Sequence, residues 1–209
     1  SQSKYQDAYN TYIELSKTPL RNGEIFYDAA QCKSQLKASD DELLALLDSA
    51  VSCFSKPYLK EAAPYLLARG SKLYDMKKYR ESVADYNEYE NLMRAELNDR
   101  FYYLREQAEV NGRIYKQALD DIAKAIEMNP KEPTYYAEQA NLMLRVNMLD
   151  DGIKSATKCI TIAPEDADGY LILGILQIKK GNKADGLQNL QKAKTLGNSQ
   201  ADALIQKYK

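Results

Sequence analysis

The second half of this 209-residue chain repeats itself with a period of 34 residues. Several columns of similar side chains keep the same step, and their agreement argues strongly against coincidence. A fixed period of this length is typical of solenoids, in which small units stack on one another. The columns are Tyr102, Tyr136 and Tyr170; Ala118, Gly152 and Gly186; Ile122, Ala156 and Leu190; Ala125, Cys159 and Ala193; and Pro130 with Pro164.

Each period contains two helical segments separated by turns. Over residues 118–126, apolar side chains recur three and four positions apart, as the buried face of a helix requires. Pro130 and Pro164 end such a segment, because proline disfavours helical geometry in the residue before it. Val146-Asn147 and Lys180-Gly181-Asn182 supply turns between the helices. The sequence therefore predicts units of helix, short turn, helix and closing turn.

These units resemble the tetratricopeptide repeat family. The resemblance rests on an aromatic residue early in the first helix, small residues where two helix backbones cross, and a closing proline. The aromatic residues are Tyr102, Tyr136 and Tyr170, followed four positions later by Ala140 and Gly174; the second helix carries Ala118, Gly152 and Gly186, then Ala125, Cys159 and Ala193, and Pro130 and Pro164 close the unit. The resemblance implies an all-α fold, a right-handed α-α superhelix of antiparallel helix pairs with a C-terminal capping helix.

One residue departs from this pattern. Glu106 stands where the family has a small residue. Either the helix register slips, so that Ala108 takes the small-residue position, or the charge is tolerated at an opened helix crossing.

The resemblance covers nearly the whole chain, and it is strongest over residues 63–198. We expect a single array, residues 1–209. Its parts are a half repeat at 1–20, a degenerate repeat at 24–58, repeats at 63–96, 99–132, 133–166 and 167–198, and a capping helix at 199–209.

The composition excludes several kinds of catalytic and metal-binding site. The chain has no histidine, which removes Ser–His and Cys–His catalytic pairs and imidazole metal ligands. Paired aspartates at 40–41, 120–121 and 150–151 lie at or near the start of expected second helices, where the helix dipole favours negative charge. Cys32, Cys53 and Cys159 are expected to be buried thiols rather than disulfides. We therefore expect no enzyme activity, no cofactor and no metal site.

The charge is balanced, with 29 basic and 30 acidic residues. Nucleic-acid binding needs a cationic face, and no basic run provides one, so we expect no nucleic-acid partner. No apolar stretch is long enough to cross a membrane, so we expect no direct membrane insertion.

The start at Ser1 and the tyrosine-rich composition favour an exported bacterial protein, periplasmic or of the cell envelope, although a cytoplasmic protein with a trimmed start explains both.

The family resemblance implies a concave groove lined by the first helix of each repeat. Amides and tyrosines there suit recognition of an extended peptide. The residues expected to bind a partner on this face are Leu67, Ser71, Tyr74, Tyr103, Gln107, Asn141 and Leu144. Co-chaperone members grip a terminal carboxylate with a cationic clamp, and here the equivalent positions hold Leu67, Ser71, Leu104, Thr134 and Glu138. We therefore expect no binding to chaperone tails.

The sequence thus predicts a non-enzymatic helical-repeat scaffold that binds a protein or peptide in its groove. The alternative is a self-association or spacer module of a larger assembly. Ile172, Ile175 and Ile178 form an apolar stripe that either contacts the terminal helix or serves as a partner or homodimer surface.

Overall fold

A computed structural model describes residues 2–54 and 59–208. Within these ranges the chain consists of α-helices and one short 3-10 helix, without a strand, so the all-α expectation is confirmed. Residues 1, 58 and 209, at which the expected half repeat, degenerate repeat and capping helix begin or end, lie outside the described residues.

The helices form two compact units. Unit 1, Ser1–Leu97, contains α1 (Gln2–Ser16), α2 (Gly23–Gln35), α3 (Asp40–Ser52), η1 (Leu59–Ala62), α4 (Ala63–Asp75) and α5 (Tyr79–Met93). Unit 2, Asn98–Lys209, contains α6 (Asp99–Asn111), α7 (Tyr115–Met128), α8 (Pro133–Arg145), α9 (Leu149–Ile162), α10 (Ala167–Lys179), α11 (Lys183–Thr195) and α12 (Ala201–Tyr208).

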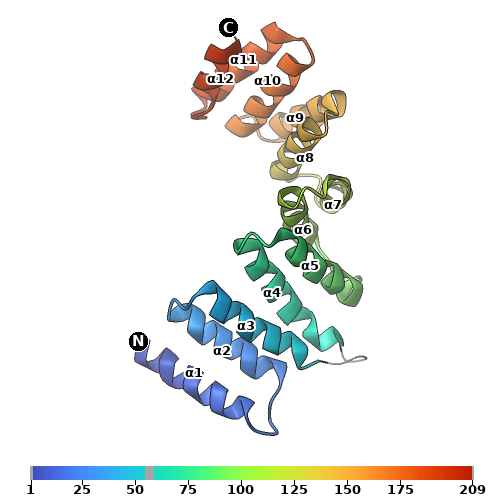
Figure 1. Ribbon diagram of the computed structural model, residues 1–209. Helices are drawn as coiled ribbons and strands as arrows, with labels where there is room; N and C mark the ends of the chain where they lie inside the picture. Colours follow the sequence, from blue (N-terminus) through green and yellow to red (C-terminus); the bar gives the residue numbers. More distant parts are fainter. Residues whose placement is uncertain (1, 55–58, 209) are drawn as a thin grey trace. The chain divides into compact units, whose positions relative to one another are not determined.

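In unit 1 each helix packs against the next one along the chain, from α1 to α5 (Figure 1). The α4–α5 crossing shows why small residues are needed there. A Cβ atom at Gly70 would lie 2.7 Å from the fully buried ring of Tyr86. The hydroxyl of Ser82 donates a hydrogen bond of 2.7 Å to the carbonyl of Gly70. The two backbones therefore meet closely.

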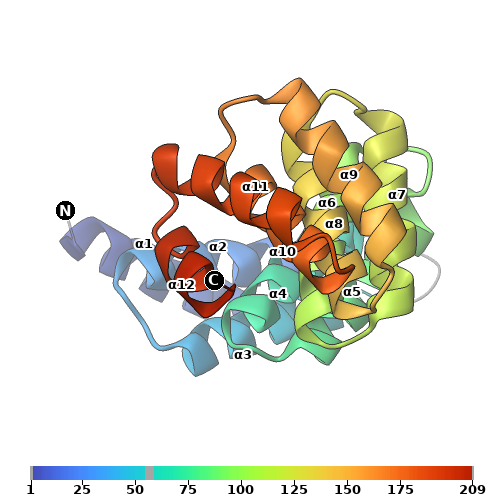
Figure 2. The ribbon, with the colours of Figure 1, turned by 90° about the horizontal axis from the view of Figure 1, so that it is seen from above.

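Unit 2 is built from the pairs α6–α7, α8–α9 and α10–α11, with α12 packed on α11 (Figure 2). Its core contains residues of the repeat columns, among them Ile122, Ala156 and Leu190, all fully buried. The short helix α12 buries Ala201 and Ile205. Burial of Ala201 and Ile205 stabilises this short helix, since isolated helices of this length are unstable in water.

The first helix of each full pair ends in the same way. The second residue after the helix adopts a left-handed conformation, with φ of 58° to 98° at Lys37, Lys77, Arg113, Asn147 and Gly181. The next N–H then bonds back to a carbonyl of the last helical turn; Asn182 N, for example, donates to the carbonyl of Gln177 at 2.8 Å. This arrangement satisfies helix-end carbonyls and starts the turn.

Candidate functional site

A pocket of about 550 Å³ opens beside α6 and the start of α8, and we call it the α6–α8 pocket. Its walls combine aromatic, aliphatic and amide side chains with one charge of each sign. Tyr103 and Gln107, both expected in the groove, belong to its lining. The lining residues are Arg100, Tyr103, Leu104, Gln107, Glu132, Thr134 and Tyr135.

The aromatic side of the pocket is held in place by hydrogen bonds. The rings of Tyr103 and Tyr135 pack with their centroids 5.1 Å apart. The hydroxyl of Tyr135 donates to Asp99 at 2.9 Å, and the amide of Asn129 donates to the same carboxylate at 3.0 Å. These donors hold the pKa of Asp99 below its usual value, the Asn129 bond most of all. An oriented aromatic pair of this kind offers rigid apolar area to a ligand.

A buried ion pair fixes α6 to its partner helix. Arg105 on α6 donates to both carboxylate oxygens of Asp121 on α7, at 2.6 Å and 2.9 Å. Both side chains are almost fully enclosed, with exposures of 5% and 3%. A two-bond pair restricts geometry more than a single contact does, so α6 is held firmly against α7.

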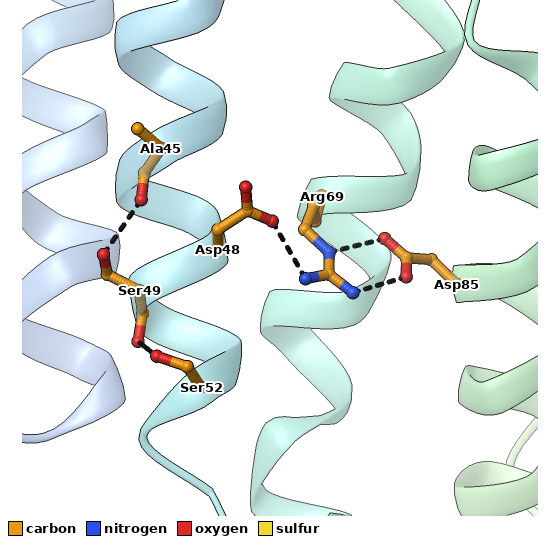
Figure 3. A network of polar contacts seen from close by, with 6 residues as sticks. All are labelled: Ala45, Asp48, Ser49, Ser52, Arg69 and Asp85. Carbon is orange, nitrogen blue, oxygen red and sulfur yellow. Dashed lines mark hydrogen bonds and ion pairs between the residues drawn. The ribbon is translucent and has the colours of Figure 1, made fainter.

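The same arrangement occurs in unit 1. Arg69 on α4 donates to both oxygens of Asp85 on α5, at 2.8 Å and 2.7 Å (Figure 3). Its remaining nitrogen donates to Asp48 on α3 at 3.0 Å, so one guanidinium joins three helices. Each arginine and its main aspartate are 16 residues apart, as equivalent positions of a repeat should be.

Next to the pocket, α6 buries two acidic side chains. Glu106 is fully buried and Glu109 has an exposure of 1%. Burial raises the pKa of each carboxyl to about 8, helped by the charge of Glu138 at Glu106 and of Asp121 at Glu109. Gln107 donates to Glu106 at 2.7 Å, which connects the pocket lining to this interior. Ala108 is also fully buried, so Glu106 and Ala108 both lie inside unit 2.

The remaining predicted residues of unit 2 lie on α8 and α10. Asn141 is half-buried near Glu138, whose pKa is raised chiefly by burial, while Asn141 acts to lower it. Leu144 packs against the core cluster to which Ile172 belongs. Ile172 is buried, while Ile175 and Ile178 are half-buried.

The predicted residues of unit 1 line separate pockets. Ser71 belongs to a pocket of about 310 Å³ between α2, α3 and α4. Leu67 belongs to another, of about 290 Å³, between α4, η1 and α5. Tyr74 packs edge-on against Tyr79, with ring centroids 5.5 Å apart. The single groove that joins these residues with those of α6 and α8 stays a prediction.

The sequence does not predict the network around α6, although Glu106, Gln107 and Asp121 each stand out in it for another reason. Asp121 was interpreted as a helix-start carboxylate, but α7 begins at Tyr115, and Asp121 is buried against Arg105. Asp40–Asp41 and Asp150–Asp151 do lie in first helical turns. The 36-residue step from Arg69 to Arg105, matched by the step from Asp85 to Asp121, was the available signal.

The described residues bear on metal binding, membrane spanning and the state of the thiols. Within them, no group of three or more Cys, Asp or Glu side chains is placed to hold a metal ion. None of the described helices is long and apolar enough to cross a membrane. Cys32 and Cys159 are buried and Cys53 is half-buried, and all three are free thiols.

The backbone closely matches solved repeat proteins. YrrB, a TPR protein with an unusual peptide-binding site, superposes with a TM-score of 0.74 at 19% identity, covering 94% of this chain and 97% of YrrB. MamA from Desulfovibrio magneticus RS-1, solved from residue 41 to its end, gives 0.72 at 18% identity, covering 85% of this chain and 96% of that chain. The fold is that of the tetratricopeptide repeat. The helical solenoid expected from the sequence is thereby confirmed.

Sequence comparison agrees with this repeat assignment. Hsp70-Hsp90 organizing protein 2 of Arabidopsis thaliana is 30% identical over 78 residues, which are 37% of this chain and 14% of that protein. Hsp70-Hsp90 organizing protein 3 of the same plant is 25% identical over 173 residues, 81% of this chain and 27% of that protein. The chain spans between 8% and 27% of the length of the curated relatives it matches. No family model matches the chain.

Proposed function

We propose that this tetratricopeptide-repeat chain is a non-enzymatic scaffold that binds a protein or peptide. The observation that carries the proposal is the α6–α8 pocket, in which Tyr103 and Gln107 lie side by side with Tyr135. Tyrosine faces pack apolar side chains, and a glutamine amide can bond an extended backbone. The pocket volume of about 550 Å³ suits one or two side chains of a bound segment.

The relatives support a protein-binding role but do not define the partner. Organizing proteins of Hsp70 and Hsp90 are among them, as is a TPR protein with a peptide-binding site. In this chain the positions of the co-chaperone clamp hold no cation; Thr134 is one of them and lines the pocket. We propose that the ligand is an internal peptide segment rather than a chaperone tail.

The test begins by selecting, from a displayed peptide library, the peptides that bind the purified chain. For a selected peptide, Tyr103→Ala combined with Gln107→Ala should weaken the Kd at least about tenfold, the effect of losing a buried aromatic contact. Tyr103→Phe keeps the ring and should retain most of the affinity. Tyr5→Ala removes an exposed tyrosine of α1 and serves as the control.

Melting temperatures of all variants show whether a loss of affinity reflects unfolding. An unchanged Kd in the folded double variant would exclude the α6–α8 pocket as the binding site. The contribution of Leu67, Ser71, Tyr74, Asn141 and Leu144 can be measured with the same peptide by single substitution. Self-association through Ile175 and Ile178 stays the alternative, and light scattering at high concentration decides it.

A further inference from the structure

Two glutamates of α6 lie in the interior of unit 2 without full hydrogen bonding. Glu106 has an exposure of 0% and Glu109 of 1%. In the part of the chain that the structure describes, Oε1 of Glu106 and Oε2 of Glu109 have no hydrogen-bond partner. An ionised carboxylate in such a place has lost its hydration without replacement, so the neutral acid is favoured.

The surrounding charges do not compensate for both carboxylates. Arg105 donates two short hydrogen bonds to Asp121, and its Nε lies 3.9 Å from Glu109. The facing charged groups are Arg105 on α6, Asp121 and Lys124 on α7, and Glu138 and Arg145 on α8. Asp121 and Glu138 add repulsion, and Lys124 lies 3.7 Å from Asp121, partly in solvent.

Glu106 is connected to the pocket through one hydrogen bond. The amide nitrogen of Gln107 donates to Oε2 of Glu106 at 2.7 Å, and Gln107 lines the α6–α8 pocket. When Glu106 ionises, its carboxylate requires hydration, which the closed interior does not supply. The Gln107 bond to Oε2 favours the ionised form, but Oε1 has no donor among the described residues, and water could reach it only if α6, which carries Gln107, shifted from its packed position.

We propose that Glu106 and Glu109 make the α6–α8 pocket pH-sensitive: in their neutral forms they keep α6 packed and Gln107 in place, and on ionising they loosen this wall. The consequence for ligand binding rests on the proposed function, whereas the proton uptake itself does not.

The direction of the pH effect follows from the two carboxyls. Each has a pKa of about 8 in the folded chain, above the ordinary 4.5 expected when unfolded. Their contribution to stability is therefore complete below about pH 4.5 and is lost progressively as the pH rises to about 8. Above that pH both states are ionised and the loss is constant.

Thermal unfolding of the full chain between about pH 5 and about pH 9 tests the proton uptake. The melting temperature of the wild type should fall by several degrees across this range. In Glu106→Gln combined with Glu109→Gln the fall should become much smaller, Glu138 with its raised pKa supplying the remainder, and Glu127→Gln, an exposed glutamate of α7, should behave like the wild type. An equal slope in the double variant would overturn the proposal.

The connection to the pocket has its own readout, which needs no ligand. The side-chain amide resonance of Gln107, assigned by its absence in Gln107→Ala, should shift with a midpoint near pH 8 and should stop shifting in Glu106→Gln. A Gln107 resonance that does not titrate would overturn the connection. Failure to find any binding peptide would contradict the proposed function alone, because both readouts here are made on the free chain.

Discussion

At the scale of single residues, burial decides which ion pairs contribute to the stability of the fold. Arg105 and Asp121 are enclosed and joined by two hydrogen bonds. Lys194 and Asp202 also form an ion pair, at 2.7 Å, but both remain about half exposed to solvent. Water screens the exposed pair and solvates the remaining charge when one partner is removed. The interior of unit 2 does not solvate a charge that has lost its partner.

Arg105→Ala should therefore destabilise the chain by about 3–5 kcal/mol, because Asp121 is left buried without its partner. Lys194→Ala should cost less than about 1 kcal/mol. Urea unfolding followed by circular dichroism measures both values. Similar small losses in the two variants would show that the Arg105 pair does not hold α6 to α7.

The three thiols should differ in reactivity for the same reason. Burial, together with a contact of 3.1 Å to Asp166, raises the pKa of Cys159 to about 12, and burial raises that of Cys32. A thiol-specific reagent at mildly alkaline pH should modify half-buried Cys53 first, and Cys53→Ser should remove this fast phase. Fast modification of Cys159 in the native chain would contradict its placement.

At the scale of helices, close crossings determine where side chains are tolerated. A Cβ atom at Gly174 would lie 2.8 Å from the carbonyl oxygen of Gly186, which is backbone and cannot turn away. At Gly152 it would lie 2.9 Å from the end of the Leu176 side chain, which can shift. Gly174 lies in the first helix of its pair and Gly152 in the second helix of another pair, and the two meet different obstacles.

Gly174→Ala should destabilise the chain by about 1–3 kcal/mol, since overpacking exceeds the gain in helix propensity. Gly152→Ala should lie within about 1 kcal/mol of the wild type, because that gain, about 1 kcal/mol, offsets a side-chain adjustment. Denaturant midpoints of the two variants can be compared directly. A larger loss at Gly152 would contradict the crossing geometry.

The helical solenoid could be predicted from the sequence because small residues and prolines recur where backbones cross or turn. Turn positions are harder to predict than helices, since Lys77 and Arg113 adopt a left-handed conformation that residue type indicates at Asn147 and Gly181 but not at a lysine or an arginine. The pocket was predicted in part: Tyr103 and Gln107 line it, but Tyr135 was not expected there. Contacts across helices, such as Arg105 with Asp121, depend on packing that no local pattern contains.

At the scale of the molecule, the chain divides into two compact units, each with its own core. Unit 1 buries Leu66 and Tyr86, and unit 2 buries Ile122 and Leu190. Stability in a repeat protein is close to a sum of nearest-neighbour terms, so a block of complete helix pairs with a terminal helix can hold its own fold. Unit 2 has this form, from α6 to α12.

Residues 98–209, expressed alone, should therefore be helical and unfold cooperatively. Because Arg105, Asp121 and Glu109 all lie within this segment, Arg105→Ala should destabilise the fragment by about the same 3–5 kcal/mol as the full chain. Circular dichroism and urea unfolding of four samples, fragment and full chain with and without the substitution, form a complete cycle. A fragment that fails to fold, or a loss that differs between the two backgrounds by more than about 0.5 kcal/mol, would mean that unit 2 depends on residues before Asn98.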